Sequence, residues 1–465
     1  MDRAKPSAGD VSGGKQQVAP ALKRVTEFAL GPEPGSAPES VRMRAALQLL
    51  DTLGICIAAA PMQAGVIARQ TATLLYGGSD PRHSARMLFD GRRVSLAGAA
   101  YATATQIDNL DGHDGYNPTK GHIGVVALPT LAALEDAGSA MSGPEALATL
   151  IVGYEVAGRA GISLHASVSD YHTSGAWNAL GVAAMAARAR CHTPAMLREG
   201  LGIAEYHGPR SQMMREIAAP TMLHDGSGWG TLAGLSAAVL AEQGFTGAPA
   251  VTIEYPEAEQ HWRDLGSFWH IELQYVKPYP TCRWAHAAID AVRELRLAHG
   301  FSAADVAEIR INSINYAVEL FKGMPDSTSK AQYSLAFSVA CMVVHGRIGL
   351  EHISGAGLAD PAVAAIVART VLNVEPRHQA RYPAGRWSDV EVTLVDGRVL
   401  ASGDVHARGG PERPFSSADI VAKFMEFAAP VVGDSRAAAI RDAALDLTRP
   451  GSRFADLATH LYDPP

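Results

Sequence analysis

The residues best suited to chemistry lie close together in one stretch, residues 106–124, with the sequence QIDNLDGHDGYNPTKGHIG. Its ionisable side chains are three aspartates, two histidines and a lysine: Asp108, Asp111, Asp114, His113, His122 and Lys120. Four glycines and a proline prevent one continuous helix there, and apolar segments of helical pattern flank the stretch on both sides. We therefore expect a polar loop between two buried helices, where ionisable groups converge in partly dry surroundings.

Two later polar breaks carry the same residue types. Residues 170–177 (DYHTSGAW) contain His172, and residues 206–230 contain His224; each leads into an alanine-rich helical segment. Lys277 lies beside a proline further along the chain. Histidine and lysine can move protons at a carbon next to a carboxylate, while a cationic pocket binds the carboxylates. The alternative for any one of these histidines is a capping or surface role.

Other kinds of site find little support. His113 and His122 are nine residues apart on a glycine-bearing loop, and neither HExxH nor a clustered His/carboxylate triad occurs, so no metal site is predicted. The sequence has no GxSxG nucleophile elbow. The glycine-rich segment 226–230 (GSGWG) is too short for a phosphate-binding loop and lacks its Lys-Ser/Thr pair. We therefore predict proton chemistry.

Length and composition narrow the class of protein. A chain of 465 residues exceeds one hydrophobic core and favours two domains. It is 47% hydrophobic but only 6% aromatic, which suits closely packed helices. With 40 basic and 47 acidic residues, a net charge of −7 and no basic tract, a nucleic-acid partner is not expected.

The cysteines and the N-terminus bear on the compartment. The four cysteines are far apart and form no CxxC pair, which fits a reducing cytoplasm: Cys56, Cys191, Cys282 and Cys341. Residues 1–20 are polar at first and lack an apolar core, so we predict a disordered lead rather than a signal peptide. No run of 18 apolar residues is free of charge or proline, which argues against a membrane partner.

The hydrophobic pattern predicts a mainly α protein. Helical periodicity dominates residues 21–271 and returns in 406–465, which predicts one all-helical domain. Between them, residues 272–405 predict a smaller α+β domain. Its strands are expected within VAEIRINSIN and in a hairpin joined at Asp396-Gly397, and helices are expected within AQYSLAFSVACMVVHGRI and DPAVAAIVARTV.

The chain resembles the MmgE/PrpD family, which includes 2-methylcitrate dehydratase, cis-aconitate decarboxylase and iminodisuccinate epimerase. The resemblance extends from about Val25 to Phe424 and rests on these segments: LLDTLG, the D-x-x-D-x-H of residues 108–113 with the GHIG that follows, GYEVAGR, YHTSGAW, the LHDG-to-EQGFTGAP region and KPYPTCRWAHAAID. It implies a large helical domain, a smaller α+β lid, an active site in the cleft between them, and no cofactor.

Position by position, the resemblance implies catalytic roles for four residues. Asp108 matches the family's active-site aspartate, and His122 the histidine that closes the same loop. His172 matches the histidine before the alanine-rich helix, and Lys277 the lysine at the start of the lid.

Three positions depart from the family pattern. Gly112 replaces a threonine, Thr221 replaces a lysine common in dehydratases and decarboxylases, and Cys282 replaces a histidine found in some members. Loss of a lysine removes a carboxylate clamp or proton donor, which argues most against decarboxylation. Lys120 supplies a positive charge from another direction. The residues expected to bind substrate are therefore Lys120, His113, His224 and Cys282.

The leading hypothesis is a lyase that removes a proton next to a carboxylate of a small di- or tricarboxylate and eliminates water, as a 2-methylcitrate dehydratase does. An epimerase of the iminodisuccinate type is the alternative within the same chemistry. A dimeric scaffold without activity is the alternative from another class. In each case, the alanine- and glycine-rich helices predict an apolar face covered in a homodimer.

Overall fold

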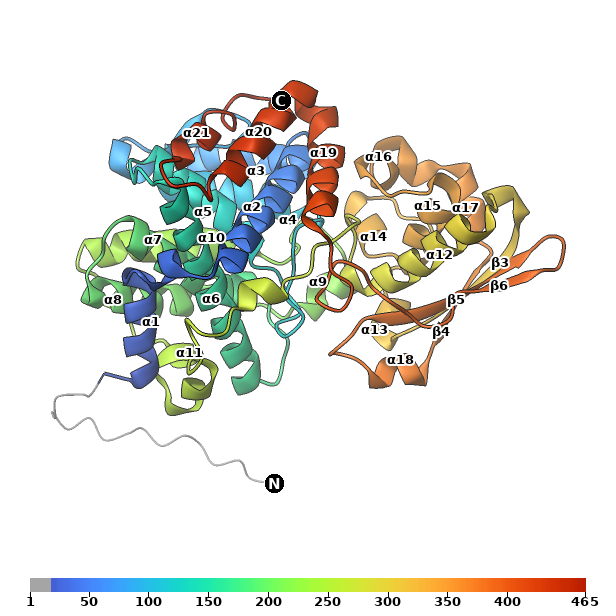
Figure 1. Cartoon of the computed structure of the whole chain (residues 1–465), viewed down its shortest axis with the longest axis horizontal. Coiled ribbons are helices and arrows are strands. Elements are labelled where there is room, and N and C mark those ends of the chain that lie inside the picture. The colour runs from blue at the N-terminus through green and yellow to red at the C-terminus, as the bar shows by residue number, and fades with distance from the viewer. Residues whose placement is uncertain (1–17) are drawn as a thin grey trace.

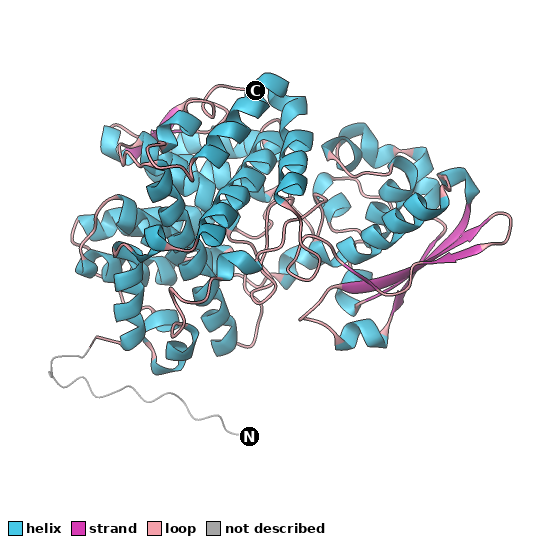
Figure 2. Ribbon diagram, viewed as in Figure 1, coloured by secondary structure: helices cyan, strands magenta, loops and turns pink. Residues whose placement is uncertain are grey.

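The computed structural model describes residues 18–465. The disordered lead predicted for residues 1–20 therefore falls, up to residue 17, outside the described residues. Figure 1 shows two parts side by side: a large helical part that contains both the early helices and the last ones, and a smaller part, coloured yellow to orange, that contains helices and a sheet. Figure 2 shows how strongly helix dominates. The predicted mainly α fold with a smaller α+β region is confirmed.

The helical part is built mostly from the first half of the chain. Its helices are α1 Pro20–Leu30, α2 Glu39–Ala59, α3 Gln63–Leu75, α4 Leu96–Asp108, α5 Gly124–Asp136, α6 Gly143–Ser167, α7 Gly175–Ala189, α8 Pro194–His207, α9 Met214–Ala218, α10 Ser227–Glu242 and α11 Val251–Glu254. A short hairpin, β1 Ser84–Arg86 and β2 Arg93–Ser95, precedes α4. Short 3-10 turns are η1 Glu33–Ser36, η2 Pro81–His83, η3 Pro256–His261 and η4 His270–Leu273.

Small residues let the central helices approach closely. A Cβ on Gly181 of α7 would lie 2.7 Å from the carbonyl oxygen of Gly153 on α6, so only glycine fits that crossing. α6 is long and apolar enough to span a membrane, but 94% of its most apolar window is buried inside the molecule, as in a core helix. The bent pair α2 and α3 passes the same test of length and composition when taken as one span.

The end of the chain returns to the helical part. α19 Ser417–Val432, α20 Asp434–Asp446 and α21 Phe454–Ala458 pack there, α19 along α2 and α21 against α5 (Figure 1). Ser416 caps α19: its Oγ accepts a hydrogen bond from the main-chain N–H of Asp419, and the Asp419 carboxylate accepts one from the main-chain N–H of Ser416.

The α+β part has one sheet of five strands, β4-β3-β5-β6 with β7 paired to β5. Its elements are η5 Arg283–Ala285, α12 His286–His299, η6 Ala303–Asp305, β3 Val306–Ser313, α13 Asn315–Val318, α14 Thr328–Gln332, α15 Leu335–His345, α16 Leu350–Ile353, η7 Gly355–Ala359, α17 Pro361–Val367, β4 Thr370–Val374, α18 Pro376–Ala380, β5 Trp387–Leu394, β6 Val399–Ala401 and β7 Val405–His406. The hairpin predicted at Asp396-Gly397 joins β5 to β6.

One predicted helix is too long at its C-terminal end. The helix expected over DPAVAAIVARTV ends at Val367, and Thr370–Val374 form β4, which pairs parallel to β3. The two elements follow each other so closely that alanine-rich helical residues mask the β-branched pair Thr370-Val371, and a partner distant in sequence decides their conformation.

A buried ion pair ties α19 to the loop between α4 and α5. The Lys423 ammonium lies 2.5 Å from Oδ1 of Asp51 on α2 and donates a hydrogen bond of 2.7 Å to the carbonyl of Gly112. Burial lowers the pKa of Lys423 and raises that of Asp51, while each charge offsets the effect on the other. The pair therefore depends on both partners.

Replacing Lys423 by Met should lower the free energy of unfolding by about 3–5 kcal/mol, because it leaves the Asp51 carboxylate buried without a counter-ion. The double variant Asp51→Asn/Lys423→Met should recover much of that loss. Urea unfolding measures both. The matched control is Lys23→Met, which removes an exposed pair with Glu27 and should leave stability nearly unchanged. A single variant as stable as the control would contradict this account.

Candidate active site

The polar loop lies between α4 and α5 and is joined to the start of the α+β half of the chain. Gly115 and Tyr275 form an antiparallel bridge, with N–H to O distances of 3.0 and 2.8 Å in the two directions. A Cβ on Gly115 would overlap the Tyr275 ring. The bridge brings Lys277, two residues further on, against the loop.

Lys277 is buried, with 1% of its surface exposed, and its ammonium is held by the loop. It donates to the main-chain carbonyl of Asp111 at 3.0 Å and forms an ion pair with the carboxylate of the same residue. Asp111 has φ of +52°, which turns its carbonyl and carboxylate toward the same cation. An ammonium has three N–H donors, so one remains for a further acceptor.

His122 is fixed at three points. Its main-chain N–H donates to Ser174 Oγ at 3.0 Å, its carbonyl accepts from the Asn178 amide at 2.9 Å, and its Nδ1 lies 2.5 Å from the carbonyl of Asp114. A carbonyl only accepts, so Nδ1 carries the proton and Nε2 is left with a free lone pair. Nε2 lies 3.6 Å from Oδ2 of Asp225, whose other oxygen accepts from Ser174 Oγ.

Burial sets the protonation of these groups. It lowers the pKa of His122 to about 4, with a further lowering by the Lys277 charge, so the imidazole is neutral at neutral pH. Burial also raises the pKa of Asp225. A neutral, oriented imidazole in a dry site is suited to accept a proton.

A small cavity of about 40 Å³, called the chamber below, brings both halves of the chain together. It is lined by Asp111, Lys120, His122, Tyr171, Met213, Ile217, Asp225, Tyr275, Lys277, Cys282, Arg283, Trp284, Tyr333 and Arg386. His122 and Lys277, separated by 155 positions in sequence, face the same space. The chamber thus joins an oriented base to several cations.

Four of the residues predicted for the site line the chamber: His122, Lys277, Lys120 and Cys282. The other four lie around it, and the roles predicted for them stay predictions. Asp108 ends α4, and its Oδ2 accepts from the Ser227 N–H at 3.1 Å. Its surroundings include a separate cleft of about 170 Å³.

The remaining three are histidines. The His113 ring lies behind His122, with ring centres 4.6 Å apart, and neither of its nitrogens has a hydrogen-bond partner. His172 directs Nε2 to Asp170 at 3.4 Å. The His224 ring lies 6.0 Å from that of Tyr333.

Several lining residues were missed from sequence. Asp111 has the signal that was assigned to Asp108, since both belong to the same D-x-x-D segment, but only Asp111 reaches Lys277. Asp225 is adjacent to His224, and Arg283 is adjacent to Cys282, so each was one position from a predicted residue. Arg386 precedes β5 in a stretch without any local signal for a site.

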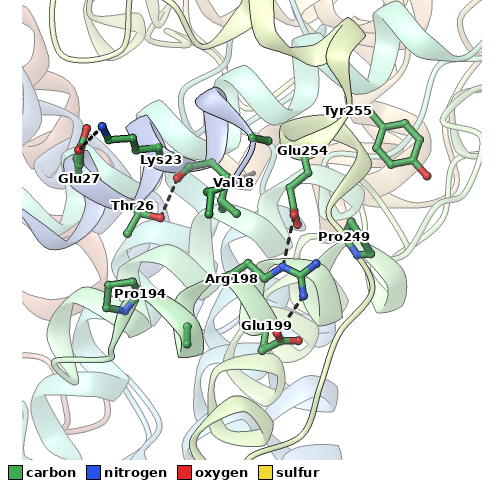
Figure 3. Close-up of a pocket in the computed structure, with 13 residues that line it drawn as sticks. Val18, Lys23, Thr26, Glu27, Pro194, Arg198, Glu199, Pro249, Glu254 and Tyr255 are labelled. Carbon is green, nitrogen blue, oxygen red and sulfur yellow. Dashed lines mark hydrogen bonds and ion pairs between the residues drawn. The ribbon is translucent and has the colours of Figure 1, made fainter. Parts of the chain in front are cut away.

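A much larger cavity, about 810 Å³, lies between α1, α8 and residues 249–255 (Figure 3). Its charged groups are already paired: Arg198 with Glu199 at 2.9 Å and with Glu254 at 3.4 Å. It contains no histidine among its lining residues. Its charges therefore supply no free cation and no base, whatever its size.

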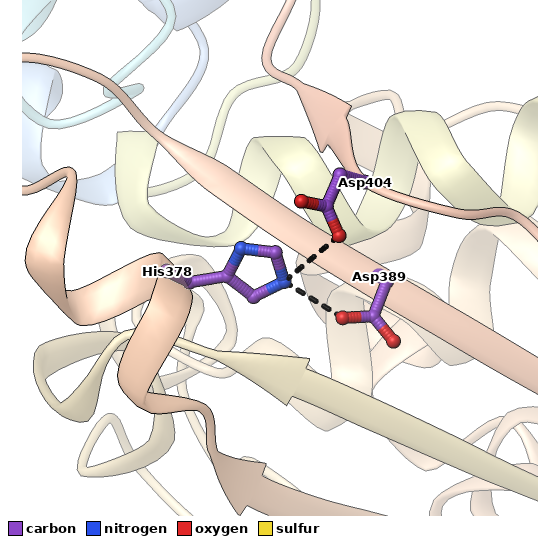
Figure 4. Close-up of side chains that lie close together, drawn as sticks. All are labelled: His378, Asp389 and Asp404. Carbon is purple, nitrogen blue, oxygen red and sulfur yellow. Dashed lines mark hydrogen bonds and ion pairs between the residues drawn. The ribbon is translucent and has the colours of Figure 1, made fainter.

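One group of side chains has the spacing of metal ligands: His378, Asp389 and Asp404 in the α+β part (Figure 4). Arg377 donates to both carboxylates, and Arg381 donates to Asp404 at 2.8 Å. Arg377 binds Oδ1 of Asp389, and the Asn312 side chain on β3 donates to Oδ2 of Asp389 at 2.7 Å. Every carboxylate oxygen already has a donor, and two guanidinium groups would repel a cation, so these residues fit an ion-pair network better than a metal centre.

The chain is similar to known proteins over most of its length. Residues 23–259 match the MmgE/PrpD N-terminal domain, and residues 279–449 match the MmgE/PrpD C-terminal domain. Cis-aconitate decarboxylase of Aspergillus terreus (strain NIH 2624 / FGSC A1156) is 24% identical over 411 residues, which cover 80% of this chain and 82% of the relative. A second Aspergillus terreus protein of the same name is 24% identical over 412 residues with the same coverage. The two matched domains span most of the sequence, and the chain belongs to the MmgE/PrpD family.

Proposed function

We propose that this protein is a cofactor-independent lyase that removes a proton next to a carboxylate of a small di- or tricarboxylate and then eliminates water. The observation that carries the proposal is that a neutral, oriented His122 and the Lys277 ammonium line the same chamber. Membership of the MmgE/PrpD family, together with similarity to two proteins named cis-aconitate decarboxylase, supports an enzyme of the dehydratase or decarboxylase kind.

The first step is proton abstraction at His122. Nε2 takes the proton from the carbon next to a substrate carboxylate, and the electron pair of the C–H bond moves toward that carboxylate. The developing enolate-like charge is met by the remaining N–H of Lys277, which Asp111 holds in place. Such fixed donors act most strongly in a site from which water is excluded.

The second step is loss of the hydroxyl group. As the carbon–carbon double bond forms, the carbon–oxygen bond breaks, and the leaving hydroxide needs a proton to depart as water. Burial raises the pKa of Tyr333 well above its ordinary value, so its phenol is protonated and lies at the chamber wall. We assign the donor role to Tyr333 rather than to Tyr171, whose hydroxyl is already bonded to the carbonyl of Lys120.

The chamber must open for this reaction. Binding sites for small molecules typically occupy about 300–1,000 Å³, whereas the chamber has about 40 Å³, which is room for a few water molecules. Its wall combines residues of the helical part with residues of the α+β part. Movement of one part relative to the other would therefore enlarge it.

Decarboxylation is the second candidate, since both relatives are named cis-aconitate decarboxylase. Loss of CO₂ moves the charge of a carboxylate onto carbon, so cations fixed on that carboxylate would oppose it. Lys277, which lies with His122 at the reacting end, favours proton abstraction instead, where the charge moves onto the carboxylate.

Incubation of the protein with citrate, 2-methylcitrate and cis-aconitate in deuterated water, followed by proton NMR, tests the reaction type. Formation of an alkene acid from a hydroxy acid, or its reverse, is the expected result. CO₂ release from cis-aconitate without reaction of the hydroxy acids would replace the proposal by decarboxylation. Proton exchange without net product would indicate an epimerase. Absence of reaction with any related acid would favour the third hypothesis, a dimeric scaffold without activity.

Replacement of His122 by Ala should lower turnover by about 100- to 10,000-fold, because it removes the base from the proton-transfer step. Lys277→Met should weaken substrate binding as well as turnover, since the ammonium acts in both the ground state and the transition state. Steady-state kinetics separate the two effects. His207→Ala, which changes an exposed histidine at the end of α8, is the matched control and should keep full activity. A His122→Ala enzyme as active as this control would exclude His122 as the base.

The pH profile provides an independent check. Because burial and Lys277 lower the pKa of His122 from 6.5 to about 4, the base is already deprotonated well below neutral pH. After correction for ionisation of the substrate, kcat/KM should rise as pH increases through about 4 and then remain level to neutral pH. A rising limb centred near 6.5 would show that another group, or a solvated His122, governs the step.

A further inference from the structure

Two arginines line the chamber from the α+β side and lack an acidic partner. Arg283, in η5, and Arg386, just before β5, are 5% and 3% exposed. Arg283 donates to the carbonyls of Ala407 at 3.1 Å and Arg408 at 2.6 Å, and Arg386 donates to the carbonyl of Pro383 at 2.5 Å. Within residues 18–465 neither guanidinium is paired with a carboxylate, and the Nε of each is buried without a hydrogen-bond partner.

A third cation lies at the same wall. The Lys120 ammonium is 4.5 Å from the centre of the Tyr171 ring and is half-buried, and it too has no carboxylate partner in the described part of the chain. Burial and the charge of Arg386 lower its pKa. Burial also lowers the pKa of Arg283 to about 10, and Arg386 again contributes. The charge of Arg386 thus acts against both Lys120 and Arg283, while Asp290 and Glu412 offset part of that effect at Arg283.

This arrangement contrasts with that of two other cations nearby, the buried Lys277 and the partly exposed Arg408. Lys277 is paired with Asp111, and Arg408 is paired with Asp290 at 2.8 Å. Burying a charge without a counter-ion is costly. A cluster of unpaired cations at the wall of a cavity therefore gains its counter-ion only when an anion binds in the cavity.

The two guanidinium groups are also held in fixed planes. Arg283 lies over the Tyr275 ring at 4.4 Å, and Arg386 lies over the Tyr382 ring at 4.7 Å. A stacked guanidinium presents its N–H groups as a rigid fork that matches a carboxylate. Pre-organisation of this kind lowers the entropy lost on binding.

We propose that Arg283, Arg386 and Lys120 form a subsite for the distal carboxylate of the substrate, the one remote from the carbon that gives its proton to His122. The proposal rests on the proposed function and narrows its substrate class to acids with at least two separated carboxylates. His122 and Lys277 hold the reacting end, and the arginines hold the other end from the opposite part of the molecule.

Lys120 also marks a route by which the acid reaches this subsite from a second cavity. Besides the chamber, it lines an open cavity of about 470 Å³ together with residues that include His165, Asp170 and Tyr316. Lys120 and Tyr171 are shared by the two cavities and so form the wall between them. A carboxylate that enters the open cavity meets the Lys120 ammonium first, and the arginines lie beyond it.

The test compares Arg386→Gln with the wild-type protein in binding and in turnover. Calorimetry would use propane-1,2,3-tricarboxylate, glutarate and butyrate as probes. The wild-type protein should bind the first two more tightly than butyrate. Arg386→Gln should weaken that advantage by roughly 30-fold or more, because one cation of a desolvated pair is lost, and it should leave butyrate binding unchanged.

Two further variants keep the result interpretable. Arg386→Lys retains the charge but not the fork and should fall between the wild type and Arg386→Gln. Arg369→Gln removes an exposed arginine of the α+β part that bonds a main-chain carbonyl, outside the chamber, and should bind all three probes as the wild type does. Thermal unfolding confirms that each variant is folded.

The outcomes separate this proposal from the proposed function. Equal loss of binding for all three probes, or an unchanged KM for a polycarboxylate in Arg386→Gln, would overturn the subsite while leaving the reaction intact. Selective polycarboxylate binding that Arg386→Gln abolishes, in a protein that converts no such acid, would support the subsite and overturn the lyase. Equal affinity of the wild type for butyrate and for the di- and tricarboxylate would also overturn the subsite.

Discussion

The contact on which the site depends is the short antiparallel bridge between Gly115 and Tyr275. It joins the loop after α4 to the segment that begins the α+β half. Because Lys277 follows Tyr275 by two residues, the bridge places Lys277 near His122. The bridge is possible because residue 115 lacks a side chain: a Cβ there would occupy the place of the Tyr275 ring. A glycine that looked like a simple break in a helix is thus the point at which two halves of the chain meet.

Around that bridge, burial determines what each group can do. The same dry surroundings keep His122 neutral, raise the pKa of Asp225 and leave the Tyr333 phenol protonated. Buried charges in such surroundings need partners, and Lys423 and Asp51, next to the loop, form a complete pair. Arg283 and Arg386 lack such a partner within residues 18–465, so they bear on the ligand, whereas the paired charges bear on stability.

Sequence reasoning succeeded where the signal is local. Helical periodicity and the hairpin at Asp396-Gly397 depend on neighbouring residues, and the structure confirms them. The glycine-broken loop was also recognisable, and His122 and Lys277 were assigned through the resemblance to a family. What failed depends on distant partners: β4 exists because β3 lies beside it, and Arg386 reaches the chamber only through the packing of the α+β part. Asp111 and Asp108 are indistinguishable by residue type, and only the turn at Asp111 decides which meets the lysine.

The bond from Lys423 to Gly112 also has a consequence for the order in which the molecule is made. These residues are 311 positions apart, so at a synthesis rate of about 5–20 residues per second the loop leaves the ribosome roughly 15 to 60 s before the lysine that supports it. During that interval the helices around the loop can form, but its carbonyl and the Asp51 carboxylate lack their cation. The nascent chain is therefore expected to acquire its finished loop only when α19 folds back onto α2, which makes the docking of α19 the step that completes the loop.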